Sequence, residues 1–352
     1  MADTRHDIPL PFHPISHRNN MMVVRYVLCI YVILGHIMVL TNKDIPWMDA
    51  PIMAVGGFFA LSGFLLFPSF QKKQTLRHYI SRRARRILPP YVLIVVLCTT
   101  TLWSVSNFSI TEYLQSQDTW QYLVANLSFL NFLHPTLPGV FTGPEYVTPA
   151  VNGSLWTMKG EWVCYLSVPL IFSIISRGRR KTGIIVLSSI ICVTIFSEWL
   201  LLELAESTAN RLYSLLAKQF GTMIVFFYIG ALINYLLPTF IKYRWWLFSI
   251  SLVCIFAQDY IPLYHLIVLP FATSILTLFI SLTGSWGVKL SRDDNVSYDM
   301  YLFHFPIIQL FIFFGLPEKL PLWIFALSTI LLTYIAGMFS WNLVGKHILR
   351  QN

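Results

Sequence analysis

The sequence is poor in charge and poorest in acidic side chains. Of its 352 residues only 12% are charged, and 16 aspartates and glutamates stand against 25 lysines and arginines. Hydrophobic residues make up 56% of the chain, and the mean hydropathy is +0.62. This composition excludes an ordinary soluble domain and predicts a membrane protein with several transmembrane helices.

Cysteine is scarce as well. The five cysteines lie inside apolar runs at unrelated spacings, so they predict neither a disulfide framework nor a metal site. The net charge of +9 is expected to lie in the cytoplasmic loops of a membrane protein. We therefore predict contact with membrane lipids and no binding of nucleic acid.

Ten apolar runs are close to the length that crosses a bilayer as a helix. They predict an all-α polytopic membrane bundle of about ten transmembrane helices. One transmembrane domain is expected over residues 21–345, between tails at 1–20 and 346–352. The predicted spans are 21–41, 51–69, 87–105, 155–176, 183–203, 219–237, 245–260, 262–283, 298–316 and 321–343.

The basic residues predict the orientation of these spans. With both termini cytoplasmic, 19 of the 25 lysines and arginines fall on the cytoplasmic side and four fall outside. This is the asymmetry expected of a multi-pass protein. The same topology places residues 106–153 outside, so Tyr122–Leu133 is expected to be an interfacial or re-entrant segment that does not cross.

Arg25 and His36 are both polar residues within the first span. Eleven residues separate them, which places them on nearly the same helix face and about 16 Å apart along the axis. An imidazole at this depth predicts a functional site lining a polar cavity. Two structural alternatives remain: a neutral histidine bonded to a neighbouring helix, and an arginine that extends to lipid phosphates.

The strongest basic run comes directly before the third span. Within it, Arg83 and Arg86 stand three residues apart on one helix face and predict a phosphate-binding pair, although such runs often serve only membrane orientation. Glu161 lies near the outer end of the fourth span. We predict that it faces the same cavity as His36, with a structural ion pair to Lys159 as the alternative.

The ninth span opens with Tyr298, Tyr301 and His304, which recur at every third residue and predict one polar stripe. Because this span begins on the predicted cytoplasmic side, the stripe is expected to meet a cytoplasmic ligand. An aromatic packing edge with a hydrogen-bonded histidine fits the spacing equally well.

Together these segments resemble the acyltransferase-3 family of integral membrane acyltransferases, which O-acetylate cell-surface sugars. Five motifs carry the resemblance, in the family's order and across most of the chain. They are Arg25 with His36, the glycine-rich Gly56–Leu65, the arginine–proline run Arg82–Tyr91, Asn152–Thr157 with Glu161, and Ser297–Pro306.

The resemblance implies an O-acetyltransferase of the cell inner membrane that uses acetyl-CoA from the cytoplasm and no metal. Its acceptor would be a hydroxyl of a lipid-linked or surface polysaccharide, or another small acceptor. The resemblance implies that His36 and Glu161 are the catalytic residues. It implies that the donor is bound by Arg25, Arg83, Arg86, Tyr298, Tyr301 and His304.

Two other classes of function remain open at this point. A transporter or flippase of lipid-linked sugars would also be a helical bundle with buried charges, although no paired halves are visible. A non-catalytic scaffold for polysaccharide assembly would tolerate the loss of His36.

Overall fold

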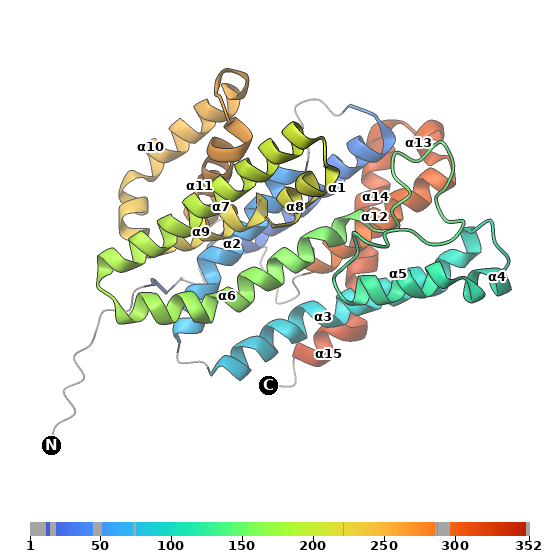
Figure 1. The fold of residues 1–352 in the computed structure, drawn as a ribbon, viewed down its shortest axis with the longest axis horizontal. Helices are drawn as coiled ribbons and strands as arrows, with labels where there is room; N and C mark the ends of the chain where they lie inside the picture. Colours follow the sequence, from blue (N-terminus) through green and yellow to red (C-terminus); the bar gives the residue numbers. More distant parts are fainter. Residues whose placement is uncertain are drawn as a thin grey trace. The chain divides into compact units, whose positions relative to one another are not determined.

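The computed structural model describes residues 12–14, 19–44, 51–72, 75–220, 222–285, 287 and 296–349. Every regular element in these residues is helical, so the predicted all-α fold is confirmed (Figure 1). The elements are α1 (Met21–Thr41), α2 (Ile52–Gln71), α3 (Leu76–Thr101), η1 (Leu102–Val105), α4 (Ile110–Gln115), α5 (Gln117–Leu127), η2 (Gly153–Trp156), α6 (Thr157–Arg177), α7 (Arg180–Thr208), α8 (Arg211–Phe220), α9 (Thr222–Tyr235), α10 (Leu237–Phe256), η3 (Gln258–Tyr260), η4 (Tyr264–Val268), α11 (Leu269–Leu282), α12 (Ser297–Phe313), α13 (Leu316–Lys319), α14 (Leu322–Ser340), η6 (Trp341–Gly345) and α15 (Lys346–Leu349).

Among the described residues, eight helices are long and apolar enough to cross a membrane. The other two predicted spans correspond to shorter helices, α9 with 14 residues and α12 with 17. The eight are Met21–Thr41, Ile52–Gln71, Leu76–Val105, Gly153–Arg177, Arg180–Thr208, Leu237–Phe256, Tyr264–Leu282 and Leu322–Gly345.

Two helices begin well before the predicted spans. α3 starts at Leu76 and includes the basic run, and α10 starts at Leu237 and includes Lys242 and Arg244. Charged residues do not end a helix, because a side chain that extends beyond the apolar region leaves the backbone hydrogen bonds intact. α5, with 11 residues, is too short to cross a bilayer, as predicted.

The chain divides into two compact units, and each draws on segments distant in sequence. The first unit consists of Met1–Met21, Gly56–Ile80 and Gly160–Val288. The second unit consists of Met22–Val55, Ser81–Lys159 and Lys289–Asn352. The first therefore holds most of α2 and α6 with α7–α11, and the second holds α1, most of α3, and α12–α15.

In the first unit, α2 and α9 pack backbone against backbone. A Cβ atom at Gly63 would overlap the carbonyl group of Phe227, and one at Gly230 would overlap the carbonyl of Ala60. Small residues allow this close approach between membrane helices, as the glycine-rich second span predicts.

Part of the predicted N-terminal tail is packed in the first unit. Phe12 is fully buried and stacks on Phe67 with ring centroids 4.7 Å apart. Its backbone exchanges two hydrogen bonds with the amide of Gln71, at 3.0 and 2.8 Å. The polar composition of residues 1–20 gives no sign of this anchor.

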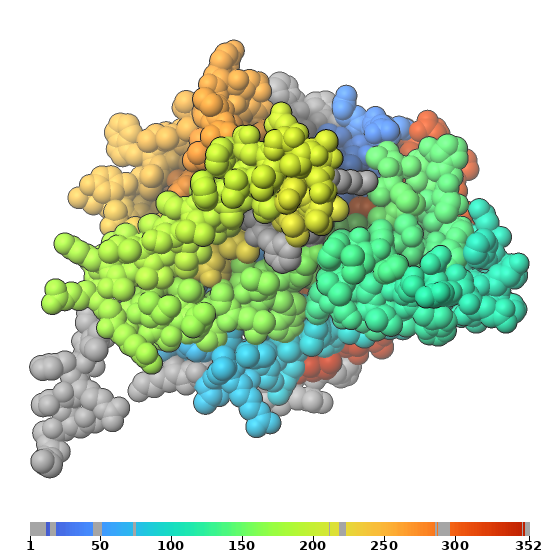
Figure 2. Space-filling view, in the orientation of Figure 1, coloured from blue at the N-terminus to red at the C-terminus, as the bar shows by residue number. Residues whose placement is uncertain are grey.

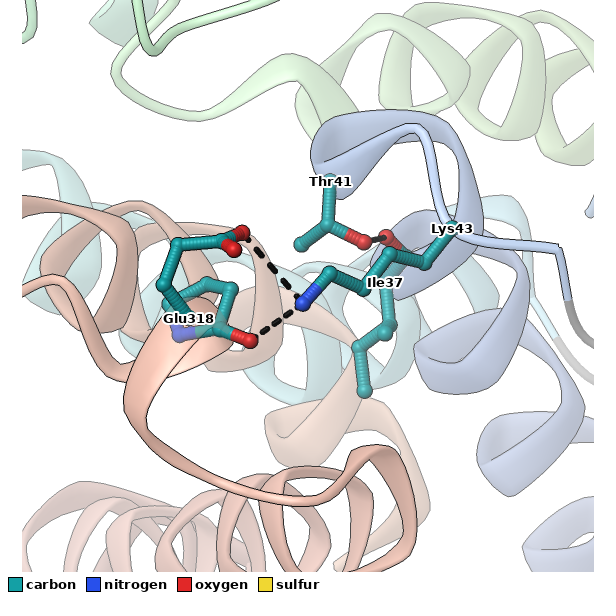
Figure 3. Close-up of polar contacts among 5 residues, drawn as sticks. Ile37, Thr41, Lys43 and Glu318 are labelled. Atoms are coloured by element: carbon teal, nitrogen blue, oxygen red, sulfur yellow. Dashed lines mark hydrogen bonds and ion pairs between the residues drawn. The ribbon is translucent and has the colours of Figure 1, made fainter.

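In the second unit, a loop contact joins the end of α1 to α13 (Figure 3). Lys43 lies 3.3 Å from the carboxylate of Glu318 and also donates to the carbonyl of Pro317. The Thr41 hydroxyl donates to the Ile37 carbonyl within α1, at 2.7 Å. Glu318 is 82% exposed, so the ion pair contributes at most about 1 kcal/mol and mainly orients the loop.

Apolar side chains also cover outward surfaces, as expected of helices that face lipid. α7, yellow-green in Figure 2, exposes Ile185, Val193 and Phe196 among others. In water such a surface would cause association, whereas hydrocarbon chains solvate it without penalty.

The contact between α2 and α9 leads to a prediction for Gly63. Gly63→Val forces the two backbones apart, and overpacking of this kind costs about 1–3 kcal/mol or more. We expect less protein in membranes and a lower Tm in detergent, measured by fluorescence-detected size exclusion after heating. Gly160→Ala is the control, since its Cβ would meet Phe59 at an ordinary 3.8 Å. An unchanged Tm for Gly63→Val would contradict the close packing.

Candidate functional site

Arg25 and His36 lie on the single unbroken helix α1, as their spacing predicts. At 1.5 Å per residue they are about 16 Å apart along the axis, on nearly the same face. Both side chains are half-buried, within a helix apolar enough to cross a membrane. A single element therefore carries a permanent cation and a titratable imidazole at different depths.

His36 lies against a second histidine, His304 of α12. Nδ1 of His36 is 3.1 Å from Nε2 of His304, and the ring centroids are 4.8 Å apart. The same Nδ1 is 3.0 Å from the carbonyl oxygen of Val32. His304 is completely buried, and its Nδ1 lies 2.6 Å from the carbonyl oxygen of Tyr301. The two rings thus form a hydrogen-bonded polar pair within apolar packing.

The register of α1 against α12 explains why the histidines meet. Cys29 donates to the carbonyl of Ser297 at 3.5 Å, and the two histidines follow seven residues later on their respective helices. The helices therefore run in the same direction and in register over two turns.

This register corrects one expectation from the sequence. The predicted topology assigns the stripe that contains His304 to the cytoplasmic side and His36 to the outer half. α12 begins beside Cys29, which is already about two turns into α1, so its residues lie deeper than their place in the predicted span implies. His304 and His36 consequently share one depth.

A proline in α12 connects two of the sequence motifs. Pro306 has no N–H, so the carbonyl of Leu302 four residues earlier loses its helical partner. The side-chain amide of Asn152 donates to that carbonyl at 2.9 Å. The Ser154 hydroxyl in turn donates to Asn152 Oδ1 at 2.7 Å. The Asn152–Trp156 segment therefore supplies the hydrogen bond that a helix within hydrocarbon cannot obtain from water.

The two tyrosines of the stripe are held by neighbouring segments of the same unit. The Tyr301 hydroxyl donates to the carbonyl of Ser154 at 3.0 Å and lies 2.8 Å from the Thr157 hydroxyl. The Tyr298 hydroxyl donates to the carbonyl of Ile87 at 3.3 Å. These contacts fix the face of α12 that carries His304. The expectation that the stripe binds a cytoplasmic ligand stays a prediction.

Arg86 belongs to a polar cluster at the start of α12. Its guanidinium lies over the ring of Trp341, 5.2 Å from the centroid, and interacts electrostatically with Asp299. Asp299 is buried and accepts a hydrogen bond of 2.6 Å from Ser340. A buried carboxylate needs such partners. Arg86 therefore has a structural role, in addition to any role in binding a ligand.

The remaining predicted residues are placed on separate elements. Arg83 lies one turn before Arg86 on α3 and is half-buried. Glu161 lies on α6 in the first unit, where it accepts a hydrogen bond from Tyr165. The cavity shared by Glu161 and His36 stays a prediction, because the structure describes the two units separately. Lys159 lies 4.0 Å from the centroid of the Phe132 ring, a cation–π contact.

Sequence reasoning did not identify Asp299, Ser340 or the pairing of the two histidines. Asp299 stands inside the tyrosine–histidine motif and carries the usual signal of a functional or paired group, a carboxylate within an apolar run. Ser340 carries no comparable signal, since a single serine in a membrane helix is ordinary.

The chain was compared with known proteins. A family model described as an acyltransferase domain matches residues 18–341. "Nodulation protein 10" of Rhizobium leguminosarum bv. viciae is 22% identical over 336 residues, which cover 89% of each chain. "O-acetyl transferase" of Shigella phage Sf6 is 23% identical over 350 residues, which cover 96% of this chain and 98% of that protein. No solved structure matches.

The cluster around Arg86 leads to a prediction about stability. Arg86→Gln removes the positive charge that acts on the Asp299 carboxylate, so we expect a lower Tm in detergent and a loss of about 0.5–3 kcal/mol, the range for interacting neighbours. The double variant Arg86→Gln with Asp299→Asn should recover most of that loss, because no buried charge then remains.

Arg82→Gln, one position from Arg83 and exposed, is the control and should leave the Tm unchanged. Additive effects of the Arg86 and Asp299 changes would show that the two residues do not interact.

Proposed function

The chain belongs to the acyltransferase-3 family and is a membrane O-acyltransferase, and we propose that it moves an acetyl group from acetyl-CoA to a sugar hydroxyl. The proposed donor site opens to the cytoplasm. The proposed acceptor is a lipid-linked or surface polysaccharide, reached from the other side of the inner membrane, or another small acceptor. The similarity to the "O-acetyl transferase" of Shigella phage Sf6 supports acetyl as the group transferred.

The observation that carries the proposal is the half-buried imidazole of His36, hydrogen-bonded to His304 inside a membrane helix bundle. O-acyl transfer needs a group that removes the proton of the acceptor hydroxyl, or one that carries the acyl group for part of the cycle. An imidazole performs both tasks near neutral pH. His36 is therefore proposed as the general base or the acyl carrier.

In the base route, one step moves the acetyl group from coenzyme A to the acceptor. The hydroxyl oxygen of the acceptor attacks the thioester carbon while its proton moves to His36. A C–O bond forms, the C–S bond breaks, and the thiolate of coenzyme A takes the proton from His36 as it leaves. In the carrier route, His36 attacks the thioester carbon, the C–S bond breaks and the thiolate of coenzyme A is released. The acceptor hydroxyl then attacks the acyl-imidazole, the C–N bond breaks, and the hydroxyl proton passes to the thiolate.

Arginines are proposed to hold the phosphates of coenzyme A. Guanidinium groups match phosphate oxygens with paired donors, and Arg25 lies on the same helix face as His36. Arg83 and Arg86 share a face of α3. Arg86 would combine this role with its electrostatic interaction with Asp299. Tyr298, Tyr301 and His304 are proposed to shape the donor site from α12.

Glu161 is proposed to orient His36 or to bind the sugar. Its support is physical, since a carboxylate within a membrane span is costly unless it performs a function or is paired. The hydrogen bond from Tyr165 fixes the carboxylate in one orientation within the first unit.

The central experiment tests His36. We expect His36→Ala to lower the rate of acetyl transfer about 10²–10⁴-fold, because a positioned base contributes that much. The assay uses purified protein in detergent, radiolabelled acetyl-CoA and a sugar acceptor, and it measures the ester formed.

His265→Ala, which removes an exposed histidine of η4, is the control and should keep the wild-type rate. Normal activity of His36→Ala would remove His36 from the mechanism. A non-catalytic scaffold would form no ester in this assay, with or without His36. Binding of acetyl-CoA without any ester product would contradict acetyl transfer from this donor.

A separate prediction concerns donor binding. Arg83→Gln should raise the KM for acetyl-CoA about tenfold and leave kcat nearly unchanged, because it removes a contact to a part of the donor that does not react. Arg82→Gln, with its exposed side chain, is the matched control. An unchanged KM for Arg83→Gln would mean that this arginine serves membrane orientation alone.

A further inference from the structure

The hydrogen bonds of the histidine pair specify which ring nitrogens carry protons. Nδ1 of His304 lies 2.6 Å from the carbonyl oxygen of Tyr301. A carbonyl only accepts, so Nδ1 of His304 must be the N–H of the ring. A neutral imidazole has one N–H, and an ionised ring is costly to bury completely. Nε2 of His304 is therefore an acceptor.

The ring proton of His36 is specified by its own two partners. Its Nδ1 faces two acceptors, the carbonyl oxygen of Val32 at 3.0 Å and Nε2 of His304 at 3.1 Å. If Nδ1 were unprotonated, its lone pair would face the lone pairs of both acceptors, which is electrostatically unfavourable. Nδ1 of His36 must carry the ring proton, and the lone pair of the neutral ring is then on Nε2.

We propose that His304 is a positioning residue, which holds His36 in the tautomer whose Nε2 accepts the proton of the acceptor hydroxyl. The proposal rests on the function proposed above and adds to it the residue that orients the base. When Nε2 of His36 takes the proton, the Nδ1–H donates more strongly to His304, which thereby stabilises the imidazolium. The proton then leaves from Nε2 to the thiolate of coenzyme A, and the pair returns to its starting state.

The membrane explains why an imidazole would take a place that a carboxylate holds in soluble enzymes. In serine hydrolases an aspartate orients the catalytic histidine and fixes its tautomer. An ionised carboxylate deep in a bilayer has a large free-energy cost, whereas a neutral imidazole offers a hydrogen-bond acceptor without bringing a charge. His304 is also held rigidly, since Tyr301 receives its Nδ1–H and Asn152 secures the adjacent turn at Leu302.

Three substitutions of His304 separate positioning from packing. In His304→Gln the amide oxygen reaches the place of Nε2 and accepts from His36. The amide of His304→Asn reaches only the place of Nδ1, and His304→Leu fills the volume without an acceptor. We expect Gln to retain kcat within about tenfold, and Asn and Leu to lose about 10²-fold or more in kcat, a loss larger than the change in the KM for acetyl-CoA that follows from the place of His304 at the donor site.

If His304 served packing alone, the kcat of His304→Leu would exceed that of His304→Gln, because Leu preserves apolar contacts that Gln disrupts. Equal kcat values for Gln and Leu would overturn the proposal. The Tm of each variant is recorded, and if Leu fails to accumulate, the comparison of Gln with Asn decides the question.

A spectroscopic measurement tests the tautomer without reference to activity. The protein is labelled with ¹⁵N-histidine in lipid nanodiscs, and the His36 signals are assigned by their loss in His36→Ala. We expect a protonated Nδ1 and an unprotonated Nε2 at His36 in the wild type and in His304→Gln, and a mixture in His304→Leu.

The two measurements distinguish failure of this inference from failure of the proposed function. In one outcome, His36→Ala is inactive while His304→Leu keeps both the tautomer of His36 and the wild-type kcat. That result overturns the positioning role of His304 but still supports His36 as the base. Full activity of His36→Ala removes the base itself, and the proposal that His304 serves it falls with it.

Discussion

The hydrogen bond between the rings of His36 and His304 is the interaction on which the rest of the site depends. It joins α1 to α12 within apolar packing, and it gives each of the two imidazoles a polar partner from the other helix. The bond forms only because the two helices run in register from Cys29 and Ser297 onward. A shift by one residue would rotate one ring by about 100° and separate the pair.

A segment of the second unit supports the turn of α12 that carries His304. Pro306 removes a hydrogen bond from α12, and Asn152 replaces it, so a segment distant in sequence is attached to the turn that carries His304. Tyr301 is held by Ser154 on the same face. Motifs that look separate along the chain are thus parts of one support. The residues that resemble the family's motifs therefore also stabilise α12 and the segments packed against it.

Sequence reasoning was most successful where one local property decides the structure. A run of about twenty apolar residues forms a helix regardless of its neighbours, so the ten predicted spans all correspond to helices. It was less successful at boundaries, as at Leu76 and Leu237, because charge marks the membrane edge and not the helix end. It gave no sign of the burial of Phe12, which depends on partners as remote as Gln71.

The sequence by itself determined the membrane class, the all-α fold, the placement of Arg25 and His36 on one helix, and the resemblance that the family match confirms. Those properties follow from composition, periodicity and motif order. These can be read from short segments or summed along the chain, without knowledge of tertiary contacts. Only the tertiary structure decided that His304 meets His36 and that Arg86 interacts electrostatically with Asp299. Such pairs depend on the register and depth of helices far apart in the chain, and many arrangements of the same spans satisfy the hydrophobic pattern equally well.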